Sequence, residues 1–356
     1  MDFNIATAKK QSKGKNNKKL HILAMFFLLL SIALIIIYIF MNTDKKEPEA
    51  IPSPEVIEKE KLKILDENSN ERPVAIMIDN NIGEGLHAGL QDSYLNYEII
   101  VEGGLTRIMA IYKDRNISTI GPVRSSRHYF LDYALENDAI YAHYGWSPYA
   151  ENDIKALNVN NINGLTNEKP YWRDTSAIAP HNVFTSTEKI RSFAQEKNYS
   201  NKSSNWKLLD YSPREIKLEN LGYSEGLIPA NQVYLTYSNY QNRSYNYDPA
   251  NKYYLRIMNG KPHIDKLSNQ QLNYKNIIIM RVNNKILDKE GRQDLDTVGS
   301  GDGYYITNGY ALPIKWSKES RASKTKYTYI NGTEITVNDG NTFIQIVPLQ
   351  NEINIR

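Results

Sequence analysis

An uncharged apolar run near the N-terminus is the strongest feature of the hydrophobic pattern. It extends from Ile22 to Met41, and its polar groups are those of Ser31 and Tyr38. A helix of this length, at about 1.5 Å per residue, spans the hydrocarbon core of a bilayer. The run is longer than the apolar part of a secretory signal peptide, and no Ala-x-Ala cleavage motif follows it. The pattern therefore predicts an uncleaved transmembrane helix over residues 20–41.

Residues 42–68 form a predicted stalk between this helix and a globular region. Pro48, Pro52 and Pro54 are interspersed with lysines and glutamates, a composition typical of an extended linker. The charged run from Glu58 to Lys63 predicts a short helix near the end of the stalk.

A first globular unit, residues 69–200, is predicted to mix strands with helices. Apolar and β-branched runs indicate strands, two of which are joined through Gly103-Gly104. Ser147 before Pro148 marks one helix start, and Thr185 with Glu188 has the spacing of a capping box. The predicted strands are 73–79, 97–102, 106–112 and 139–144, and the predicted helices are 125–136, 148–157 and 185–196.

A second unit, residues 230–356, follows a connecting segment of residues 201–229 and is predicted to be a strand-rich meander. Four turn dipeptides lie between apolar or alternating runs, and residues 276–282 form a more buried strand. Asn-Gly favours a type I′ hairpin turn because both central residues need positive φ. The fold class is therefore α+β: a mixed α/β N-terminal unit and a strand-rich C-terminal unit. The dipeptides are Asn259-Gly260, Asn308-Gly309, Asn331-Gly332 and Asp339-Gly340.

The distribution of charge predicts the orientation of the membrane helix. The net positive charge of residues 1–19, which comes from six lysines and one aspartate, exceeds the formal net charge of +3 of the whole chain. The positive-inside rule places this tail in the cytoplasm and the residues after Met41 outside. Because the rest of the chain is close to neutral, no nucleic-acid partner is expected. The lysines are Lys9, Lys10, Lys13, Lys15, Lys18 and Lys19.

Several classes of chemistry lack support in the sequence. The chain has no cysteine, which excludes disulfides, thiolate metal ligands, cysteine nucleophiles and a lipid-bearing cysteine. The six histidines form no H-x-x-x-H pair, so neither a zinc site nor a cofactor is predicted. Residues 222–226 match G-x-S-x-G, but Pro229 and a strand pattern follow where a nucleophile elbow needs a helix. Residues 299–303 depart from the dinucleotide-binding pattern and predict a tight loop.

The segment 121–127, GPVRSSR, offers the clearest potential for ligand binding. If a helix starts near Ser125, Arg124 and Arg127 lie at its N-terminus, where the dipole disfavours cations but free N–H groups suit an anion. Two guanidiniums with the hydroxyls of Ser125 and Ser126 would form a phosphate or carboxylate clamp. The alternative is that both arginines pair internally with carboxylates, of which the sequence offers Asp79, Glu98, Glu102 and Asp132.

Four other polar residues are added to this candidate ligand-binding site. Asp79 ends a predicted buried strand, a position where α/β proteins place functional groups. Arg107 follows the glycine turn, and Arg173 and His181 lie in predicted loops, where binding residues concentrate. No catalytic residue is assigned, because no nucleophile–base pair or carboxylate dyad can be identified from the spacing.

Seven motifs, in order along residues 70–350, resemble the YerB-type bacterial lipoprotein family. The resemblance implies an N-terminal α/β part, a strand-rich C-terminal part and no established activity. One departure is the missing lipid-bearing cysteine, which the transmembrane helix would replace as an anchor. The motifs are PVAIMIDN at 73–80, VEGGLTR at 101–107, GPVRSSRHYFLD at 121–132, WRD at 172–174, APHNVFTS at 179–186, GRQDLDTVGSGDGYY at 291–305 and TFIQIVP at 342–348.

These observations leave three classes of function open. The first is a cell-envelope binding or scaffold module whose arginines hold an anionic ligand. The second is an envelope enzyme acting on a phosphorylated polyprenyl or glycan. Residues 120–124 after a strand, glycine turn and strand slightly resemble the LytR-CpsA-Psr proteins, which hold polyprenyl pyrophosphates with arginines. The third is protein docking through the second unit, which holds many of the 26 tyrosines. The sequence names no particular protein partner.

Overall fold

The apolar N-terminal run forms helix α1, Asn16–Asn42, in the computed structural model, which describes residues 16–42, 60–81, 86–223 and 226–356. The helix starts before the predicted residue 20 and ends one residue after Met41. It is long and apolar enough to cross a membrane, and its apolar side chains are exposed rather than packed in a protein core. These properties are compatible with membrane anchoring. Contacts divide the chain into two compact units, residues 1–59 and 60–356, and α1 belongs to the first.

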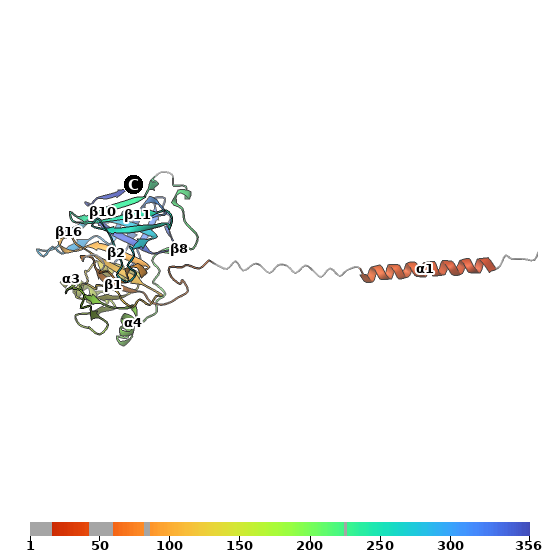
Figure 1. Ribbon diagram of the computed structural model, residues 1–356, viewed down its shortest axis with the longest axis horizontal. Helices are drawn as coiled ribbons and strands as arrows, with labels where there is room; N and C mark the ends of the chain where they lie inside the picture. The colour runs from red at the N-terminus through yellow and green to blue at the C-terminus, as the bar shows by residue number, and fades with distance from the viewer. Residues whose placement is uncertain (1–15, 43–59, 82–85, 224–225) are drawn as a thin grey trace, which may run out of the picture. The chain divides into compact units, whose positions relative to one another are not determined.

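The compact unit of residues 60–356 combines short helices with many strands in its described part (Figure 1). The α-helices are α2 Phe130–Glu136, α3 Pro148–Ala156 and α4 Thr187–Glu196, and the 3-10 helices are η1 Leu90–Asp92, η2 Glu102–Gly104 and η3 Leu218–Asn220. The strands are β1 Val74–Asp79, β2 Leu95–Ile100, β3 Thr106–Tyr112, β4 Ile140–His143, β5 Asn161–Asn163, β6 Trp172–Arg173, β7 Val183–Phe184, β8 Asp210–Ser212, β9 Ile228–Pro229, β10 Gln232–Ser238, β11 Gln241–Asp248, β12 Tyr253–Met258, β13 Lys261–Pro262, β14 Asn273–Tyr274, β15 Asn276–Val282, β16 Asn284–Ile286, β17 Gln293–Leu295, β18 Gly299–Thr307, β19 Tyr310–Lys318, β20 Lys326–Tyr329, β21 Thr336–Asn338, β22 Thr342–Pro348 and β23 Ile353–Ile355.

An eleven-stranded sheet runs through both halves of the sequence. Its order is β20-β19-β18-β15-β22-β2-β3-β1-β4-β5, with β9 added beside β19. Strand β2 pairs with β3 on one side and, in parallel, with β22 on the other. The predicted units 69–200 and 230–356 therefore share one sheet, and residues 60–356 form one compact unit. The mixed α/β first part and strand-rich second part are confirmed.

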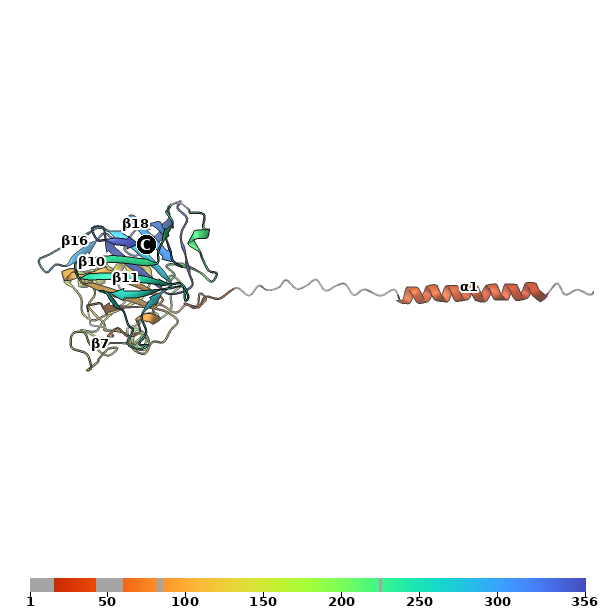
Figure 2. The ribbon, with the colours of Figure 1, turned by 45° about the horizontal axis from the view of Figure 1, so that its top comes forward.

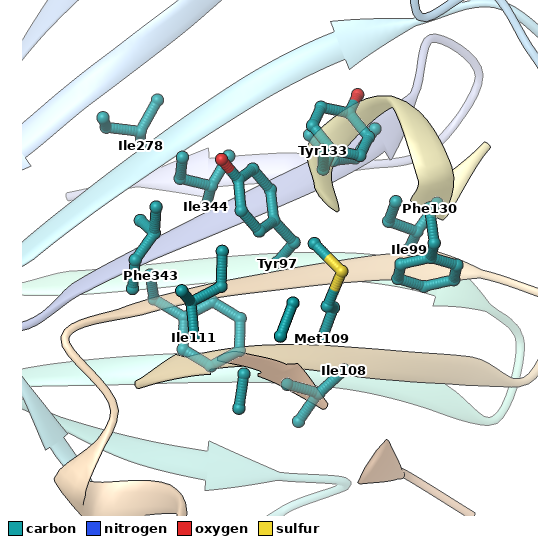
Figure 3. Packing of buried hydrophobic residues seen from close by; sticks show 14 of the residues in the cluster. Tyr97, Ile99, Ile108, Met109, Ile111, Phe130, Tyr133, Ile278, Phe343 and Ile344 are labelled. Atoms are coloured by element: carbon teal, nitrogen blue, oxygen red, sulfur yellow. The ribbon is translucent and has the colours of Figure 1, made fainter. Parts of the chain in front are cut away.

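The large sheet is covered on its two faces by different elements. On one face, Tyr97 of β2 lies near Tyr133 of α2 (Figure 3). Their ring centroids are 4.7 Å apart. On the other face lies a six-stranded sheet of order β13-β12-β11-β10-β23, with β14 beside β12. Tyr245 of β11 contacts Phe343 of β22 across this interface. Figure 1 shows β10 and β11 in the upper part of the unit with α3 and α4 below them, and Figure 2 shows both strands above β7.

A buried ionic network connects the two sheets. Glu98 of β2 accepts from Arg243 Nε at 2.7 Å and from an Arg256 terminal nitrogen at 2.8 Å, and all three side chains are fully buried. Burial alone would raise the pKa of Glu98, but the two guanidiniums and a hydrogen bond from Thr106 lower it to about 2. The network therefore holds an ionised carboxylate between the sheets.

The predicted strands of the first part are confirmed to within a few residues, whereas the predicted N-cap of α4 is wrong. Ser186, not Thr185, caps α4, and it accepts from Lys189 N. Thr185 instead exchanges two backbone hydrogen bonds with Ile120, so it belongs to the extended segment before α4 and does not act as the N-cap. The prediction for helix α3 is confirmed, with Ser147 as N-cap and Pro148 at the first position.

The last residues of the predicted stalk pack on the globular unit. Leu65 is buried, and the backbone N–H groups of Lys63 and Ile64 donate to the Asp339 carboxylate at 2.8 and 3.0 Å. Residues 60–63 are not helical, so this part of the predicted short helix is wrong, while residues 42–59 of the stalk are, apart from the end of α1, outside the described residues. The globular unit therefore begins near residue 60.

Two of the four turn dipeptides adopt the predicted type I′ geometry. Asn259-Gly260 and Asn308-Gly309 have positive φ at both residues and close two-residue hairpins. At Asn331-Gly332 only the glycine has positive φ, and Gly332 N donates to Tyr329 O, so the turn is not of the primed type. Asp339-Gly340 links β21 to β22 without forming a hairpin.

The glycine-rich stretch 299–303 is also not a tight loop. It begins β18 and pairs with β19. A Cβ at Gly303 would lie 2.0 Å from the Ile279 carbonyl oxygen, so this glycine permits close strand pairing. The G-x-S-x-G match includes residues 224 and 225, which are outside the described residues.

Candidate functional site

The segment with both candidate arginines is extended, so the prediction that they lie at a helix N-terminus is wrong. Helix α2 begins only at Phe130. Arg124 N donates to Met77 O and Ser126 N donates to Gly145 O, both at 2.9 Å. The segment is therefore inserted between the carboxyl ends of β1 and β4, and these two amides are not free to bind an anion.

This arrangement still brings several predicted site residues to one edge of the large sheet. Strands β1, β2 and β4 run in the same direction, so their carboxyl ends meet at this edge. Asp79, the last residue of β1, lies directly opposite Arg107 near the start of β3. Because paired residues face the same side of a sheet, Asp79 and Arg107 share one face there.

One carboxylate oxygen of Asp79 contacts two other residues of the predicted ligand-binding site. His181 Nδ1 lies 2.5 Å from Asp79 Oδ2, and Arg124 Nε lies 3.1 Å from the same oxygen. The Arg124 contact is an ion pair without hydrogen-bond alignment. The Asp79 carboxylate is only 3% exposed, so it is a buried anion between two basic groups.

Arg127 is engaged in an internal pair. Its Nε and a terminal nitrogen donate to the two carboxylate oxygens of Glu102 at 2.5 and 2.6 Å. Burial raises the pKa of Glu102, but the bidentate bond from Arg127 outweighs this effect and lowers it. The internal-pairing alternative thus describes Arg127 fully and Arg124 in part.

Arg107 differs from both of these arginines. Its side chain is buried, and a terminal nitrogen donates to the Ser125 carbonyl at 2.6 Å. No carboxylate among the described residues forms an ion pair with it. Burial, followed by the repulsive charge of Arg127, lowers the pKa of Arg107 to about 10. The site thus holds a desolvated cation whose own charge is not neutralised by a direct contact.

The remaining predicted residues have structural partners. The buried Ser126 hydroxyl accepts from Tyr141 at 2.8 Å, and Ser125 contributes its carbonyl to Arg107. Arg173 donates to Asn182 Oδ1 at 2.8 Å and to the Tyr144 hydroxyl at 3.3 Å. Arg173 lies on β6, which pairs with β7, and the turn between them carries His181. The β7 end of this hairpin lies beside the segment 120–126, because Ile120 pairs with Thr185 and Val123 N donates to Val183 O.

A hydrogen-bonded chain behind Asp79 could not be found by sequence reasoning. Arg256 Nε can only donate, and it meets His263 Nδ1 at 3.0 Å. His263 Nε2 therefore donates to His87 Nδ1 at 2.8 Å, and His87 Nε2 donates to the Asp79 carbonyl at 2.5 Å. No local motif marks these residues, because His87 and His263 come from opposite halves of the chain.

These features define an α+β protein with two stacked sheets, an arginine-rich carboxyl edge and an N-terminal helix that is compatible with membrane anchoring. Residues 61–200 match the family model "Protein of unknown function (DUF3048) N-terminal domain", and residues 233–344 match the corresponding C-terminal domain. The chain belongs to this DUF3048 family.

Two comparisons identify the YerB protein of Bacillus subtilis as a relative. The protein named "Putative lipoprotein YerB" from strain 168 is 29% identical over 301 residues, which cover 83% of this chain and 84% of that protein. The crystal structure of YerB matches with a TM-score of 0.69 at 28% identity and covers 80% of this chain and 94% of the YerB chain. The resemblance to YerB-type proteins is therefore confirmed, and together with α1 it indicates membrane association.

Proposed function

We propose that this protein is a membrane-anchored module of the cell envelope that binds an anionic group, a phosphate or a carboxylate, at Arg107. The observation that supports this function is the buried Arg107 guanidinium, whose hydrogen-bond partner among the described residues is the Ser125 carbonyl. A buried charge without a counter-ion costs several kcal/mol. A bound anion would supply the missing counter-charge and recover this cost.

The surroundings of Arg107 favour an anion over a cation or a neutral ligand. Arg124 and Arg127 are close enough to lower the pKa of Arg107, while Asp79 and Glu102 are the carboxylates that engage those two arginines. Three guanidiniums thus face two carboxylates. The fork of an arginine matches the oxygens of phosphate and carboxylate, and the carboxyl edge of parallel strands is a frequent ligand site.

A panel of anions tests this proposal on the globular unit, residues 60–356. Phosphate, pyrophosphate, citrate and a polyprenyl phosphate should include at least one compound that raises the melting temperature of the wild-type unit. The same compound should give no shift with Arg107→Met, but a full shift with Arg214→Met, which removes an 81% exposed arginine elsewhere. Equal shifts in both variants would contradict a site at Arg107.

The orientation of the anchor belongs to the same proposal. The lysines before α1 favour a cytoplasmic tail, so residues after Met41 are placed outside the cytoplasm. Protease added to intact protoplasts should then digest the globular unit, whereas a cytoplasmic control protein stays intact. Complete protection of residues 60–356 under these conditions would reverse the assigned orientation.

A second candidate function is an envelope enzyme that acts on a phosphorylated polyprenyl or glycan. The observation in its favour is the Asp79–His181 contact of 2.5 Å beside Arg124. A carboxylate that orients an imidazole next to an anion-binding cation is an arrangement used in acid–base catalysis. Phosphate release from a polyprenyl pyrophosphate, lost in His181→Asn but retained in Arg214→Met, would favour the enzyme. Ligand binding without any turnover would favour the binding module.

A further inference from the structure

A buried lysine and an asparagine meet where β15 begins and β18 ends. Asn276 of β15 pairs with Thr307 of β18, and the Thr307 hydroxyl donates to the Lys275 carbonyl at 3.1 Å. These bonds bring the two adjacent residues together, and Lys275 Nζ donates to Asn308 Oδ1 at 2.6 Å. An amine and a side-chain amide are therefore in direct contact.

The surroundings of Lys275 favour a neutral amine. Lys275 is 9% exposed, and its other acceptor is the Lys252 carbonyl oxygen at 3.1 Å. No carboxylate in the described part of the chain forms an ion pair with it. Burial lowers the pKa of Lys275, and the charge of Lys252 lowers it further, against the opposing charge of Glu215. A neutral primary amine is a nucleophile, and desolvation is a usual way to activate a lysine.

The side-chain amide of Asn308 is held in place as the electrophile. Asn308 has a φ of 50° in the turn between β18 and β19. Its Nδ2 donates to the Ile216 carbonyl at 2.9 Å and to Glu215 Oε1 at 3.3 Å. Because a carbonyl bond is about 1.2 Å long, Asn308 Cγ lies within about 3.8 Å of Lys275 Nζ. Reacting atoms in a near-attack arrangement are about 3–3.5 Å apart, so a small movement is enough.

Glu215 is placed to transfer a proton during such a reaction. Lys252 Nζ donates to Glu215 Oε1 at 2.7 Å, and this hydrogen bond lowers the pKa of Glu215. The ionised carboxylate can accept a proton from an attacking amine and pass it to Asn308 Nδ2, which it already contacts. Glu215 and Lys275 also line an open cavity of about 470 Å³, through which a small product can leave.

We infer that Lys275 and Asn308 form an intramolecular amide bond. The Lys275 amine attacks Asn308 Cγ, so that an Nζ–Cγ bond forms and the Cγ–Nδ2 bond breaks. One proton of the amine reaches Nδ2 through Glu215, and Nδ2 leaves as ammonia. The reaction consumes no oxidant, cofactor or second substrate. It gives a covalent cross-link to a chain that has no cysteine for disulfides, and it is independent of the proposed anion site.

Mass spectrometry of the full-length protein in detergent micelles tests this inference. The wild-type chain should be lighter than its sequence by one molecule of ammonia. A tryptic digest should contain residues 267–281 joined to residues 293–315, because trypsin does not cleave after an acylated lysine. A succinimide at an Asn-Gly pair loses the same mass, so the joined peptides are the decisive observation.

Three variants locate the reacting groups. Lys275→Arg keeps the positive charge but removes the amine, so the joined peptides should disappear. Lys315→Arg is the matched control, because it changes an exposed lysine of β19, and its cross-link should be retained. Glu215→Gln should lower the cross-linked fraction. The melting temperature of Lys275→Arg should be below that of Lys315→Arg, because a cross-link restricts the unfolded chain.

The wild-type digest alone can overturn the inference, whether or not each variant folds. Separate release of residues 267–275 and 293–315 would mean that Lys275 and Asn308 share only a hydrogen bond. A mass loss without joined peptides would lead to the same conclusion. Equal cross-linked fractions in the wild type and Glu215→Gln would exclude Glu215 from the proton transfer.

Discussion

The arginines of this protein differ in whether a carboxylate contacts the guanidinium, and this difference separates the proposed structural residues from the proposed ligand-binding residue. Arg243 and Arg256 share the buried Glu98 carboxylate, whereas Arg107, within the part of the chain that the structure describes, donates to a carbonyl and to no carboxylate. The sequence predicted Asp79 as a ligand-binding residue because it ends a strand, and Arg107 because it follows the glycine turn. It could not show which arginine is unpaired, because their partners come from distant segments.

Replacing single arginines should separate these two groups by stability. Arg256→Met removes one partner of the buried Glu98 and should lower the free energy of unfolding by about 3–5 kcal/mol. Arg107→Met removes a buried cation that has no carboxylate, so it should cost less than about 1 kcal/mol or even stabilise the fold. Urea denaturation of residues 60–356 measures both values. Equal losses would mean that Arg107 is a structural residue.

Buried histidines should make stability depend on pH. Burial lowers the pKa of His87 and His143 from 6.5 to about 4, and that of His263 well below 6.5. Between about pH 4 and pH 6.5 these histidines bind protons in the unfolded chain but not in the native state. Their contribution to stability is therefore complete above pH 6.5 and is lost as the pH falls toward 4. His87 alone accounts for on the order of 3 kcal/mol.

Denaturation midpoints measured from pH 7 to pH 4 check this expectation. His263→Gln removes one of the three histidines and should lower the slope of the free energy of unfolding against pH by about a third. A further loss below pH 4.5 should follow from Glu98, whose pKa is lowered to about 2 in the folded state. Stability that stays constant between pH 7 and pH 5 would contradict burial of neutral histidines.

At the scale of elements, local patterns predicted strands better than they predicted the start of α2. The strands 74–79 and 106–112 are buried on both faces and consist largely of apolar residues, so each is recognisable from its own sequence. The segment 120–126 looks like a helix start, but its backbone groups bind β1, Gly145 and Thr185. These partners are set by tertiary structure, so no local signal could reveal the extended conformation. The candidate site was therefore approximately located, but its proposed helix-terminus chemistry was wrong.

The turn at Gly332 gives a prediction at the same scale. Gly332 has a φ of 88°, and a Cβ there would meet nothing within 4 Å, so the cost of substitution is conformational. Gly332→Val should destabilise the globular unit by about 1 kcal/mol or more, because β-branched residues resist positive φ. Gly332→Asn is the matched control, because asparagine tolerates this region, and its denaturation midpoint should change less. Equal midpoints for the two variants would contradict a left-handed Gly332.

At the scale of the whole molecule, the two sequence-defined parts depend on each other. Strand β2 of the first part needs β22 as its neighbour, and Glu98 needs Arg243 and Arg256. The sequence predicts separate units that end near residue 200 and begin near residue 230, whereas residues 60–356 form one compact unit. The shared sheet could not be predicted, because the pairing of β2 with β22 joins segments at opposite ends of the globular unit.

A fragment of residues 60–200 should therefore not fold alone. Its β2 edge is exposed and its Glu98 is buried without arginine partners, which costs several kcal/mol. Amide NMR spectra of the fragment should show poor dispersion, and those of residues 60–356 should be well dispersed. A cooperative thermal transition of the isolated fragment would show that the first part is an independent domain.

Equilibrium binding of the most effective anion by calorimetry is the most direct test of the proposed function. The wild-type globular unit should bind it with an affinity that decreases with salt, and Arg107→Met should weaken binding at least about tenfold. Arg214→Met should bind like the wild type. If Arg107→Met binds the anion as tightly as Arg214→Met does, the buried Arg107 is not the ligand-binding residue and the central claim is wrong.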